Sequence, residues 1–229
     1  PEKEWRIGII KYINISIYEK FVLYGIREKA DITPKSFMFS SPLPGEYNRY
    51  NCLAAIATCK QLGITDENIR KALKTFRGVK GRFEKIGTGQ GFEGIIDFAH
   101  TPNAFEQVLR TVKPAVSGRL VHVFGSAAKR DVTKRPLMGE KSAAYADTIV
   151  LTEEDYRTEN VDQIIDNIAQ GIIKAGGVEM KPAEYYKAHK IEEVVFFRMP
   201  DRKEAIKFAI QKLAHLGDTI ILTGKAHEK

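Results

Sequence analysis

Long apolar runs and cysteine are the two features that this sequence has least of. No apolar segment reaches the roughly 18 residues that a membrane-spanning helix needs, and residues 1–5 lack the apolar core of a signal peptide. We therefore expect a cytoplasmic chain without membrane insertion. Cys52 and Cys59 lie seven positions apart in an apolar stretch with helical period. Two cysteines with no histidine at ligand spacing cannot form a zinc tetrad, so we expect neither a metal site nor a disulfide.

The sequence also lacks a recognisable phosphate-binding loop. It contains no G-x-x-x-x-G-K-[ST] segment, the loop whose backbone N–H groups cradle nucleotide phosphates. The glycine-rich residues 87–91 are no substitute, because they begin no helix after a strand. A hairpin turn is the better interpretation of this stretch.

The balance of charge favours anionic partners. Over 229 residues the formal net charge is +7, which suits phosphates, nucleotides or carboxylates. The basic residues are scattered among acidic ones, as in residues 157–159 and 201–204, and form no stripe interleaved with stacking aromatics. We therefore expect no nucleic-acid partner.

Gly78 and Gly81 mark a hinge, and we place a domain boundary near residue 80. Before it, apolar runs predict short strands between residues 5 and 40, and an Ala-rich helix follows Gly45. Thr65 is suited to cap a second helix. The expected strand runs are 7–10, 13–17 and 37–39, and the expected helices are 48–62 and 66–76.

Beyond residue 80, apolar strand patterns alternate regularly with helical ones. The expected strands are 93–98, 120–124, 148–151, 183–186 and 219–223, and the expected helices are 102–112, 134–145, 161–174 and 202–216. This alternation predicts an α/β fold with a doubly wound, mostly parallel, Rossmann-like sheet. Ligands of such sheets bind at the carboxyl ends of the strands.

Polar segments follow four of these strands, at residues 97–102, 125–131, 152–157 and 224–228. Because the carboxyl ends of parallel strands share one edge of a sheet, the four segments should converge on that edge, where a cleft could form. This expected convergence is stronger evidence for a site than any single segment.

Several side chains in and near these segments suit a nucleotide. The Asp97 carboxylate could accept both ribose hydroxyls, and His100 precedes a helix start where phosphate could sit; alternatively, Asp97 and Thr101 only cap that helix. Arg82 could form a bidentate pair with phosphate or an interdomain salt bridge. The amides of Asn48 and Asn51 could pair with adenine, although Asn48 could instead be a helix cap.

Other side chains suit an amino acid. Arg130 lies on a strand-to-helix turn and offers a fork for a carboxylate. Arg157 and Glu228 offer paired opposite charges for the carboxylate and ammonium of a ligand, whereas Asp155 would also accept an amine.

Together these segments resemble the Mur ligases, ATP-dependent enzymes that add amino acids to the peptidoglycan precursor, and most closely the branch that adds the third residue. The segments DFAHTP, GSAAKRD with KRP, EDYR and GKAHE are similar to the family patterns D-Y-A-H-T/N-P, G-x-G-G-D/N-R-D with K-R-P, D-N-P-R and G-K-G-H-E. NRYNCLAA and VKGR resemble F-N-x-x-N-x-L-A-A and G-V-P-G-R. The departures are Lys80 for proline, Ala127, Ala128 and Ala226 for glycine, Lys129 for an acid or amide, Asp155 for asparagine and Tyr156 for proline.

The resemblance implies an ADP-forming acid–amino-acid ligase of peptidoglycan synthesis that uses ATP and Mg²⁺. Such an enzyme forms an acyl phosphate on UDP-MurNAc-L-Ala-D-Glu, which the amine of a diamino acid attacks; retention of Arg157 favours diaminopimelate over lysine. The implied ATP-binding residues are Asn48, Asn51, Arg82, Asp97 and His100, and the implied amino-acid-binding residues are Arg130, Asp155, Arg157, Gly224 and Glu228.

By the same resemblance, residues 1–79 are the tail of the central ATP-binding domain and residues 80–229 are the amino-acid-binding domain. The phosphate loop and modified lysine of the family belong upstream, so we expect a monomeric fragment that is inactive alone. Folylpolyglutamate and cyanophycin synthetases share a D-x-A-H-N-P motif and are alternatives within the class, but the combined R-D-x-x-K-R-P and G-K-x-H-E pattern argues against them. A module that binds a nucleotide or amino acid without catalysis is the alternative outside it.

Overall fold

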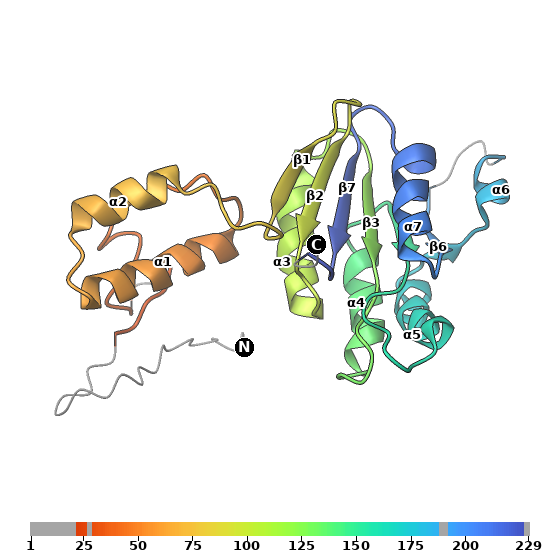
Figure 1. Ribbon diagram of the computed structural model, residues 1–229, viewed down its shortest axis with the longest axis horizontal. Helices are drawn as coiled ribbons and strands as arrows, with labels where there is room; N and C mark the ends of the chain where they lie inside the picture. Colours follow the sequence, from red (N-terminus) through yellow and green to blue (C-terminus); the bar gives the residue numbers. More distant parts are fainter. Residues whose placement is uncertain (1–21, 27–28, 188–191, 227–229) are drawn as a thin grey trace. The chain divides into compact units, whose positions relative to one another are not determined.

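The computed structural model describes residues 22–26, 29–187 and 192–226. The chain divides into two compact units, residues 1–77 and 78–229 (Figure 1). Among the described residues, no helix is both long and apolar enough to cross a membrane.

The first unit is built around two helices, α1 (Glu46–Gln61) and α2 (Asp66–Thr75). As predicted, Thr65 caps α2, and its side chain accepts a hydrogen bond from the Asn68 N–H. Helix α1 begins at Glu46 after Gly45, two residues earlier than expected, so Asn48 lies inside the first turn instead of capping it. A small core of Phe37, Leu53, Ile56 and Ile69 joins the helices to the preceding segment.

The prediction of a strand at residues 37–39 is wrong. Residues 34–36 form a turn, and Tyr24 and Ile32 form an isolated bridge. Phe37 is 1% exposed and packs among helical residues, with the Arg70 guanidinium 4.4 Å from its ring centroid. Its apolar character therefore reflects packing against helices. The runs expected at residues 7–10 and 13–17 lie outside the described residues.

The second unit contains a seven-stranded sheet in the order β1-β2-β7-β3-β4-β6-β5. Strand β1 is antiparallel to β2, and every other neighbouring pair is parallel. This arrangement confirms the predicted mostly parallel α/β fold. The strands are β1 (Glu84–Gly87), β2 (Glu93–Asp97), β3 (Leu120–Phe124), β4 (Thr148–Leu151), β5 (Val178–Glu179), β6 (Val195–Arg198) and β7 (Thr219–Thr223).

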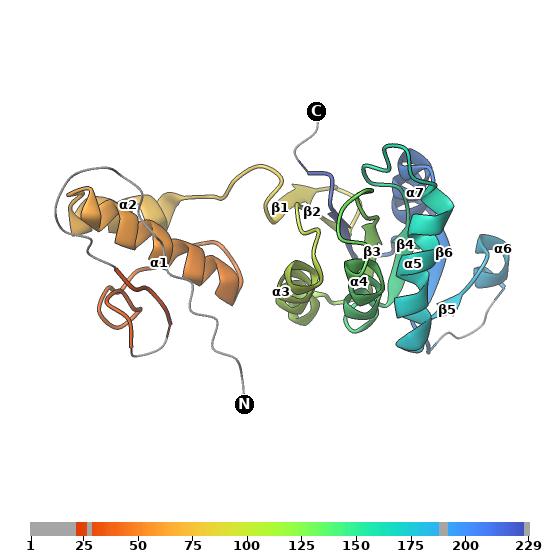
Figure 2. The same cartoon turned by 90° about the horizontal axis from the view of Figure 1, so that it is seen from below.

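Helices cover both faces of this sheet (Figures 1 and 2). Helices α3, α4 and α5 line one face, and α7 packs on the other against inward-facing residues such as Val121, Val123 and Phe197. Strands buried on both faces explain the continuous apolar runs of the sequence. The helices of this unit are α3 (Pro102–Val112), the 3₁₀ turn η1 (Lys113–Ala115), α4 (Lys134–Ala143), α5 (Val161–Lys174), α6 (Pro182–Tyr185) and α7 (Arg202–Phe208), which continues as a π-helical segment, η2 (Ala209–Leu213).

One expectation for this unit fails and one is confirmed. Residues 183–186 are not a strand, because Pro182 opens the short helix α6, where its fixed φ suits the first helical turn. The strand of this region is β6, whose first three residues are buried. The turn expected at residues 87–91 lies at residues 88–92, between β1 and β2, with Gly89 and Gly91 at φ +67° and +83°.

A fully buried histidine, His122, lies in the middle of the sheet. Its Nδ1 is 2.8 Å from Ser142 Oγ on α4, and its Nε2 is 2.9 Å from Thr223 Oγ1 at the end of β7. The ring stacks on Phe124 at 4.4 Å. Burial, helped by repulsion from the Arg202 cation, lowers the pKa of His122 to about 3. The neutral ring therefore joins α4 to the carboxyl end of β7.

This burial predicts a stability that depends on pH. The unfolded chain takes up a proton on His122 near pH 6.5 and the folded chain only near pH 3, so stability falls as the pH drops between these values, by up to about 1.4 kcal/mol per pH unit. In urea titrations followed by circular dichroism, His122→Gln should be less stable at pH 7.5 and lose stability less steeply toward pH 5. The control His215→Gln changes an exposed histidine and should keep the wild-type slope. Equal slopes in all three proteins would contradict the assignment.

The contact between α4 and α5 depends on glycine. A Cβ on Gly171 would lie 1.8 Å from the Pro136 carbonyl oxygen, whereas one on Gly87 would meet no atom within 4 Å. Gly171→Ala should therefore destabilise the protein by about 1–3 kcal/mol through overpacking. Gly87→Ala, the matched control, should change the free energy of unfolding by less than about 0.5 kcal/mol. Urea titration measures both, and equal effects would rule out the close approach as the cause.

Candidate functional site

Four neighbouring parallel strands, β2, β7, β3 and β4, end side by side at one edge of the sheet. The segments that follow them are in contact. A Cβ on Gly125 would lie 2.3 Å from the Thr152 carbonyl oxygen, and one on Gly224 would lie 2.9 Å from Glu154 Oε2. The predicted convergence of the four polar segments is therefore confirmed.

Asp97, at the end of β2, ties this edge to residues 81–84. It is 6% exposed. Its Oδ2 accepts the Phe83 N–H and its Oδ1 accepts the Ala99 N–H, both at 2.7 Å. Burial raises the pKa of Asp97, against the opposing effects of these two hydrogen bonds and of Arg82. The side chain that caps α3 is Thr101, which accepts the Ala104 N–H, so the capping alternative holds for Thr101 and fails for Asp97.

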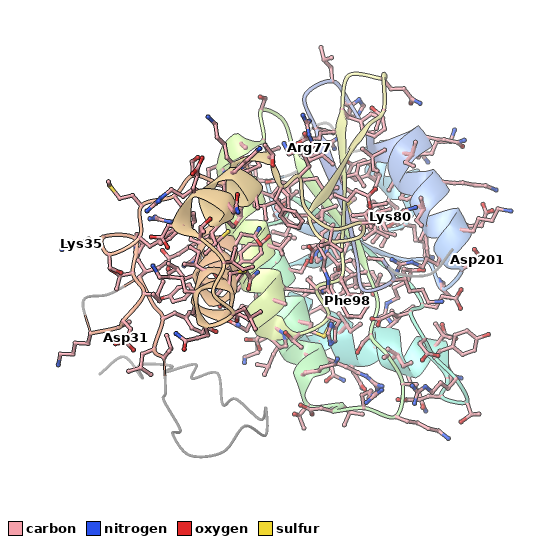
Figure 3. The ribbon with its side chains drawn as sticks, turned by 60° about the vertical axis from the view of Figure 1, so that its left-hand side comes forward. Asp31, Lys35, Arg77, Lys80, Phe98 and Asp201 are labelled. Carbon is pink, nitrogen blue, oxygen red and sulfur yellow. The ribbon has the colours of Figure 1, made fainter. Side chains whose placement is uncertain are left out.

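Arg82 and His100 flank the same strand end. The Arg82 guanidinium lies 4.3 Å from the ring centroid of Phe98, a residue labelled in Figure 3, and is exposed. The exposed His100 ring has Nδ1 3.1 Å from the Phe98 carbonyl oxygen, so Nδ1 carries the proton. The Lys134 ammonium donates to the His100 carbonyl oxygen at 2.8 Å. Helix α4 is thereby joined to the segment after β2.

The loop between β3 and α4, residues 125–133, carries Arg130. This side chain is exposed, and it follows Lys129, whose φ is +51°. The N–H of the buried Ala128 donates to the Asp155 carbonyl oxygen at 2.8 Å. Neither Ala127 nor Ala128 has positive φ, so the alanines that replace family glycines fit the path, and the left-handed residue of this loop is Lys129.

The loop between β4 and α5, residues 152–160, carries Arg157 and Asp155. Arg157 has φ +49°, and its Nε donates to Asp155 Oδ2 at 3.0 Å. Both side chains are exposed, so their pairing contributes at most about 1 kcal/mol and either partner can be exchanged for a charged ligand. Arg157 and Asp155, the two charged side chains that we expected to bind a substrate, are therefore adjacent. Glu228, the other expected partner, lies outside the described residues.

The last segment follows β7 and needs a glycine at its first position. Gly224 has φ +94° and abuts the Glu154 carboxylate. A Cβ on Gly81, at φ +70°, would lie 2.2 Å from the Ala226 carbonyl oxygen. Residues 81–84 and 224–226 are therefore in contact. The residue that must lack a side chain at this contact is Gly81, and the alanine at position 226 fits.

Sequence reasoning missed several buried polar groups behind this edge. Glu154 Oε2 is buried without a hydrogen bond among the described residues, and burial raises the pKa of this carboxyl, although the Lys134, Arg202 and His100 charges oppose the rise. Arg202 donates to the carbonyl oxygens of Thr223 and Glu153. Asp201, labelled in Figure 3, begins α7 by accepting the Glu204 N–H, which places Arg202 in the first turn. A buried arginine has no local sequence signal that would have identified it.

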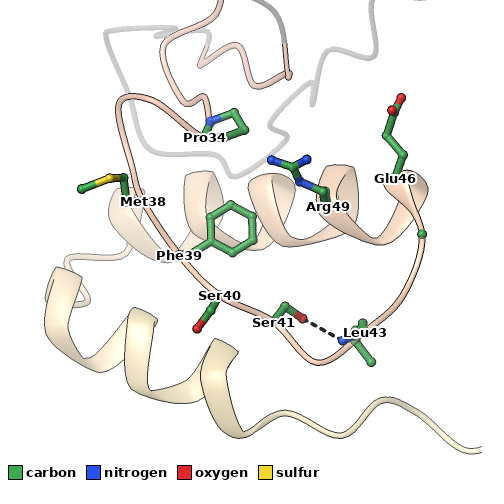
Figure 4. Close-up of a pocket in the computed structure, with 9 residues that line it drawn as sticks. Pro34, Met38, Phe39, Ser40, Ser41, Leu43, Glu46 and Arg49 are labelled. Atoms are coloured by element: carbon green, nitrogen blue, oxygen red, sulfur yellow. Dashed lines mark hydrogen bonds between the residues drawn. The ribbon is translucent and has the colours of Figure 1, made fainter.

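Asn48 and Asn51 lie in the first unit, on α1. Asn48 Nδ2 donates to the Pro44 carbonyl oxygen at 2.8 Å, and its Oδ1 accepts from Asn51 Nδ2 at 3.2 Å. The two amides therefore form a pair, and the cap alternative for Asn48 is wrong because Gly45 occupies that position. A pocket lies beside them (Figure 4), and neither amide lines it; its lining residues are Pro34, Met38, Phe39, Ser40, Ser41, Leu43, Gly45, Glu46 and Arg49.

Comparison with known proteins agrees with this geometry. The family described as "Mur ligase, glutamate ligase domain" matches residues 81–226. The UDP-N-acetylmuramoyl-L-alanyl-D-glutamate--2,6-diaminopimelate ligase of Caldanaerobacter subterraneus subsp. tengcongensis is 38% identical over 206 residues, which are 90% of this chain and 39% of that protein. The UDP-N-acetylmuramyl-tripeptide synthetase of Roseiflexus sp. is 39% identical over 186 residues, which are 81% of this chain and 34% of that protein.

A solved structure of a UDP-N-acetylmuramoyl-L-alanyl-D-glutamate--2,6-diaminopimelate ligase is 30% identical, with a TM-score of 0.54, and the match covers 90% of this chain and 42% of that one. The chain thus spans about two fifths of the length of the relatives it matches. Since the family match extends over most of the chain and includes three of the strand-end segments and the start of the fourth, the chain belongs to the Mur ligase family.

Proposed function

We propose that this chain is the amino-acid-binding part of an ATP-dependent ligase of peptidoglycan precursor synthesis. The ligase would add a diamino acid to UDP-MurNAc-L-Ala-D-Glu. The observation that carries the proposal is that four segments meet at one edge of the sheet. These segments contain Asp97, Arg130, Arg157 and Gly224. The names of the similar proteins support the same substrate class.

In this proposal the second unit binds and orients the amino acid. The exposed Arg130 guanidinium pairs with its α-carboxylate. The adjacent charges of Arg157 and Asp155, 3.0 Å apart, receive the far end of the molecule. Diaminopimelate carries both an ammonium and a carboxylate there and can satisfy both side chains. Lysine carries only the ammonium and would leave Arg157 without a ligand partner, so we propose diaminopimelate as the substrate.

The nucleotide is assigned to other residues. Arg82, Asp97 and His100 of the second unit, and the Asn48–Asn51 amide pair of the first, are the proposed ATP contacts. Asp97 already accepts two backbone N–H groups, so ribose hydroxyls would use its remaining lone pairs. The described residues contain no cluster of three or more acidic, histidine or cysteine ligands, and the proposal assigns them no Mg²⁺ ligand. The enzyme would act in the cytoplasm as a monomer, with residues 1–79 as part of its ATP-binding domain.

The proposal predicts ATP-dependent phosphate release by the enzyme that contains this chain. With UDP-muramoyl-dipeptide present, diaminopimelate should stimulate release more strongly than lysine or ornithine, because only it satisfies both charges of the Asp155–Arg157 pair. A phosphate assay with each amino acid measures this. No stimulation by any diamino acid would overturn the ligase proposal and favour the non-catalytic binding module.

Two substitutions should separate the proposed subsites. Arg157→Ala should raise the KM for diaminopimelate by about 10- to 100-fold, the effect of losing one charge-assisted contact, and leave the KM for ATP within about twofold. Asp97→Ala should do the reverse, since it removes a proposed ribose contact and releases the Phe83 N–H beside Arg82. Arg110→Ala is a matched control, because Arg110 is exposed on α3 and, among the described residues, its side chain donates only to Gln107 Oε1. Parallel changes in both KM values for either variant would contradict the assignment.

A further inference from the structure

The two loops that carry Arg130 and Arg157 are joined by an ion pair between a buried arginine and a partly buried glutamate, and no substrate role requires this pair. Arg135 lies in the first turn of α4, and its side chain is 1% exposed. Its Nη1 and Nη2 donate to the two carboxylate oxygens of Glu159 at 2.6 and 2.9 Å. Glu159 belongs to the loop after β4, so this bidentate pair links that loop to the start of α4.

The pair also reaches the loop after β3. Glu159 Oε2 accepts the Lys129 N–H at 3.2 Å, next to Arg130. Arg135 Nη2 lies 3.4 Å from the Ala127 carbonyl oxygen, and Nη1 is 3.2 Å from Asn167 Oδ1 on α5. One guanidinium and one carboxylate therefore contact both loops and both helices that follow them.

Two of the three strained non-glycine residues lie in the loops that the pair joins. Among the described residues, the non-glycine residues with positive φ are Phe83, Lys129 and Arg157, at +50°, +51° and +49°. Such a backbone conformation is strained and persists only where the surroundings impose it. Lys129 is held through its N–H by Glu159, and Arg157 lies within the turn closed by the Glu159 N–H on the Tyr156 carbonyl oxygen at 2.8 Å.

We propose that the Arg135–Glu159 pair is a positioning device that sets the separation of Arg130 and Arg157, and thereby the affinity for the amino-acid substrate, without touching that substrate. The inference rests on the proposed function for the roles of Arg130 and Arg157. Its mechanical part, one ion pair that holds two strained loops, does not.

The mechanical part is tested on the 229-residue chain itself by hydrogen–deuterium exchange. Glu159→Gln keeps the shape of the side chain but removes its charge, and it should speed exchange at least tenfold in residues 127–130 and 157–159. Arg119→Lys is the control, because the Arg119–Asp218 pair, at 2.7 Å, is also largely buried but lies at the amino ends of β3 and β7. Unchanged exchange in either loop of the Glu159→Gln protein would overturn the proposal, whatever the enzyme does.

The functional part is tested in the enzyme that contains this chain. Arg135→Lys and Glu159→Gln should each raise the KM for diaminopimelate about tenfold and leave the KM for ATP within twofold. The double variant should be no worse than either single one, because both changes break the same pair. Arg119→Lys should leave both KM values within twofold.

The outcomes separate positioning from general stability. If both KM values rise together in Glu159→Gln, or if Arg119→Lys gives the same selective change, the pair has only a structural role and the proposal fails. If Arg135→Lys does not fold, Glu159→Gln alone decides. If the unaltered enzyme shows no ligase activity while the exchange result holds, the proposed function fails. The conclusion that the Arg135–Glu159 pair holds the two loops then remains.

Discussion

Parallel pairing of β2, β7, β3 and β4 is the constraint on which the site depends. The strands run level, with Asp97 opposite Thr223 and Phe124 opposite Leu151. Their carboxyl ends therefore meet along one edge, and segments separated by more than 100 positions in the chain come into contact there. A shift in register along one strand would move its polar segment away from the others.

The polar edge depends on an apolar interior that contains few but specific polar groups. His122 is neutral and joins Ser142 to Thr223, and Arg202 donates to the Thr223 carbonyl oxygen. These contacts fix the carboxyl end of β7, at Thr223, from within the core. Buried groups of this kind are costly unless they are paired, so their pairing makes the position of Gly224 a property of the core and not of the loop alone.

Strained backbone conformations at this edge of the sheet lie in the loops that carry the proposed ligand-binding residues. Phe83, Lys129 and Arg157 each adopt positive φ in a different loop; Phe83 and Lys129 are each adjacent to a residue proposed to bind nucleotide or substrate, and Arg157 is itself such a residue. Asp97 holds the first through its N–H, and Glu159 holds the second. Backbone conformations of this kind recur where side chains must be aimed precisely. The Asp97 and Glu159 carboxylates thus support the backbone beside Arg82 and Arg130, two of the arginines that we propose to bind ligand.

Local patterns in the sequence were sufficient to predict most helices and strands of the second unit. The strands at residues 93–97, 120–124, 148–151 and 219–223 and the helices at 102–112 and 161–174 were predicted almost to the residue. Compact apolar runs and clear caps, such as Thr101 and Asn160, explain this success. The predictions failed where packing overrode the pattern, as at Phe37, which is buried against helices, and at Pro182, which opens a helix.

The sequence by itself determined the order of the elements, the polar segments at the strand ends and the resemblance to the Mur ligases. It could do so because strand and helix periods, turn residues and short motifs are local properties of the chain. Only the tertiary structure decided that Asp155 pairs with Arg157, that Asp97 binds backbone instead of capping α3, and that Arg135 and Glu159 join two loops. Those partners are distant in sequence or depend on backbone conformation, and they meet only when the sheet brings its strand ends together.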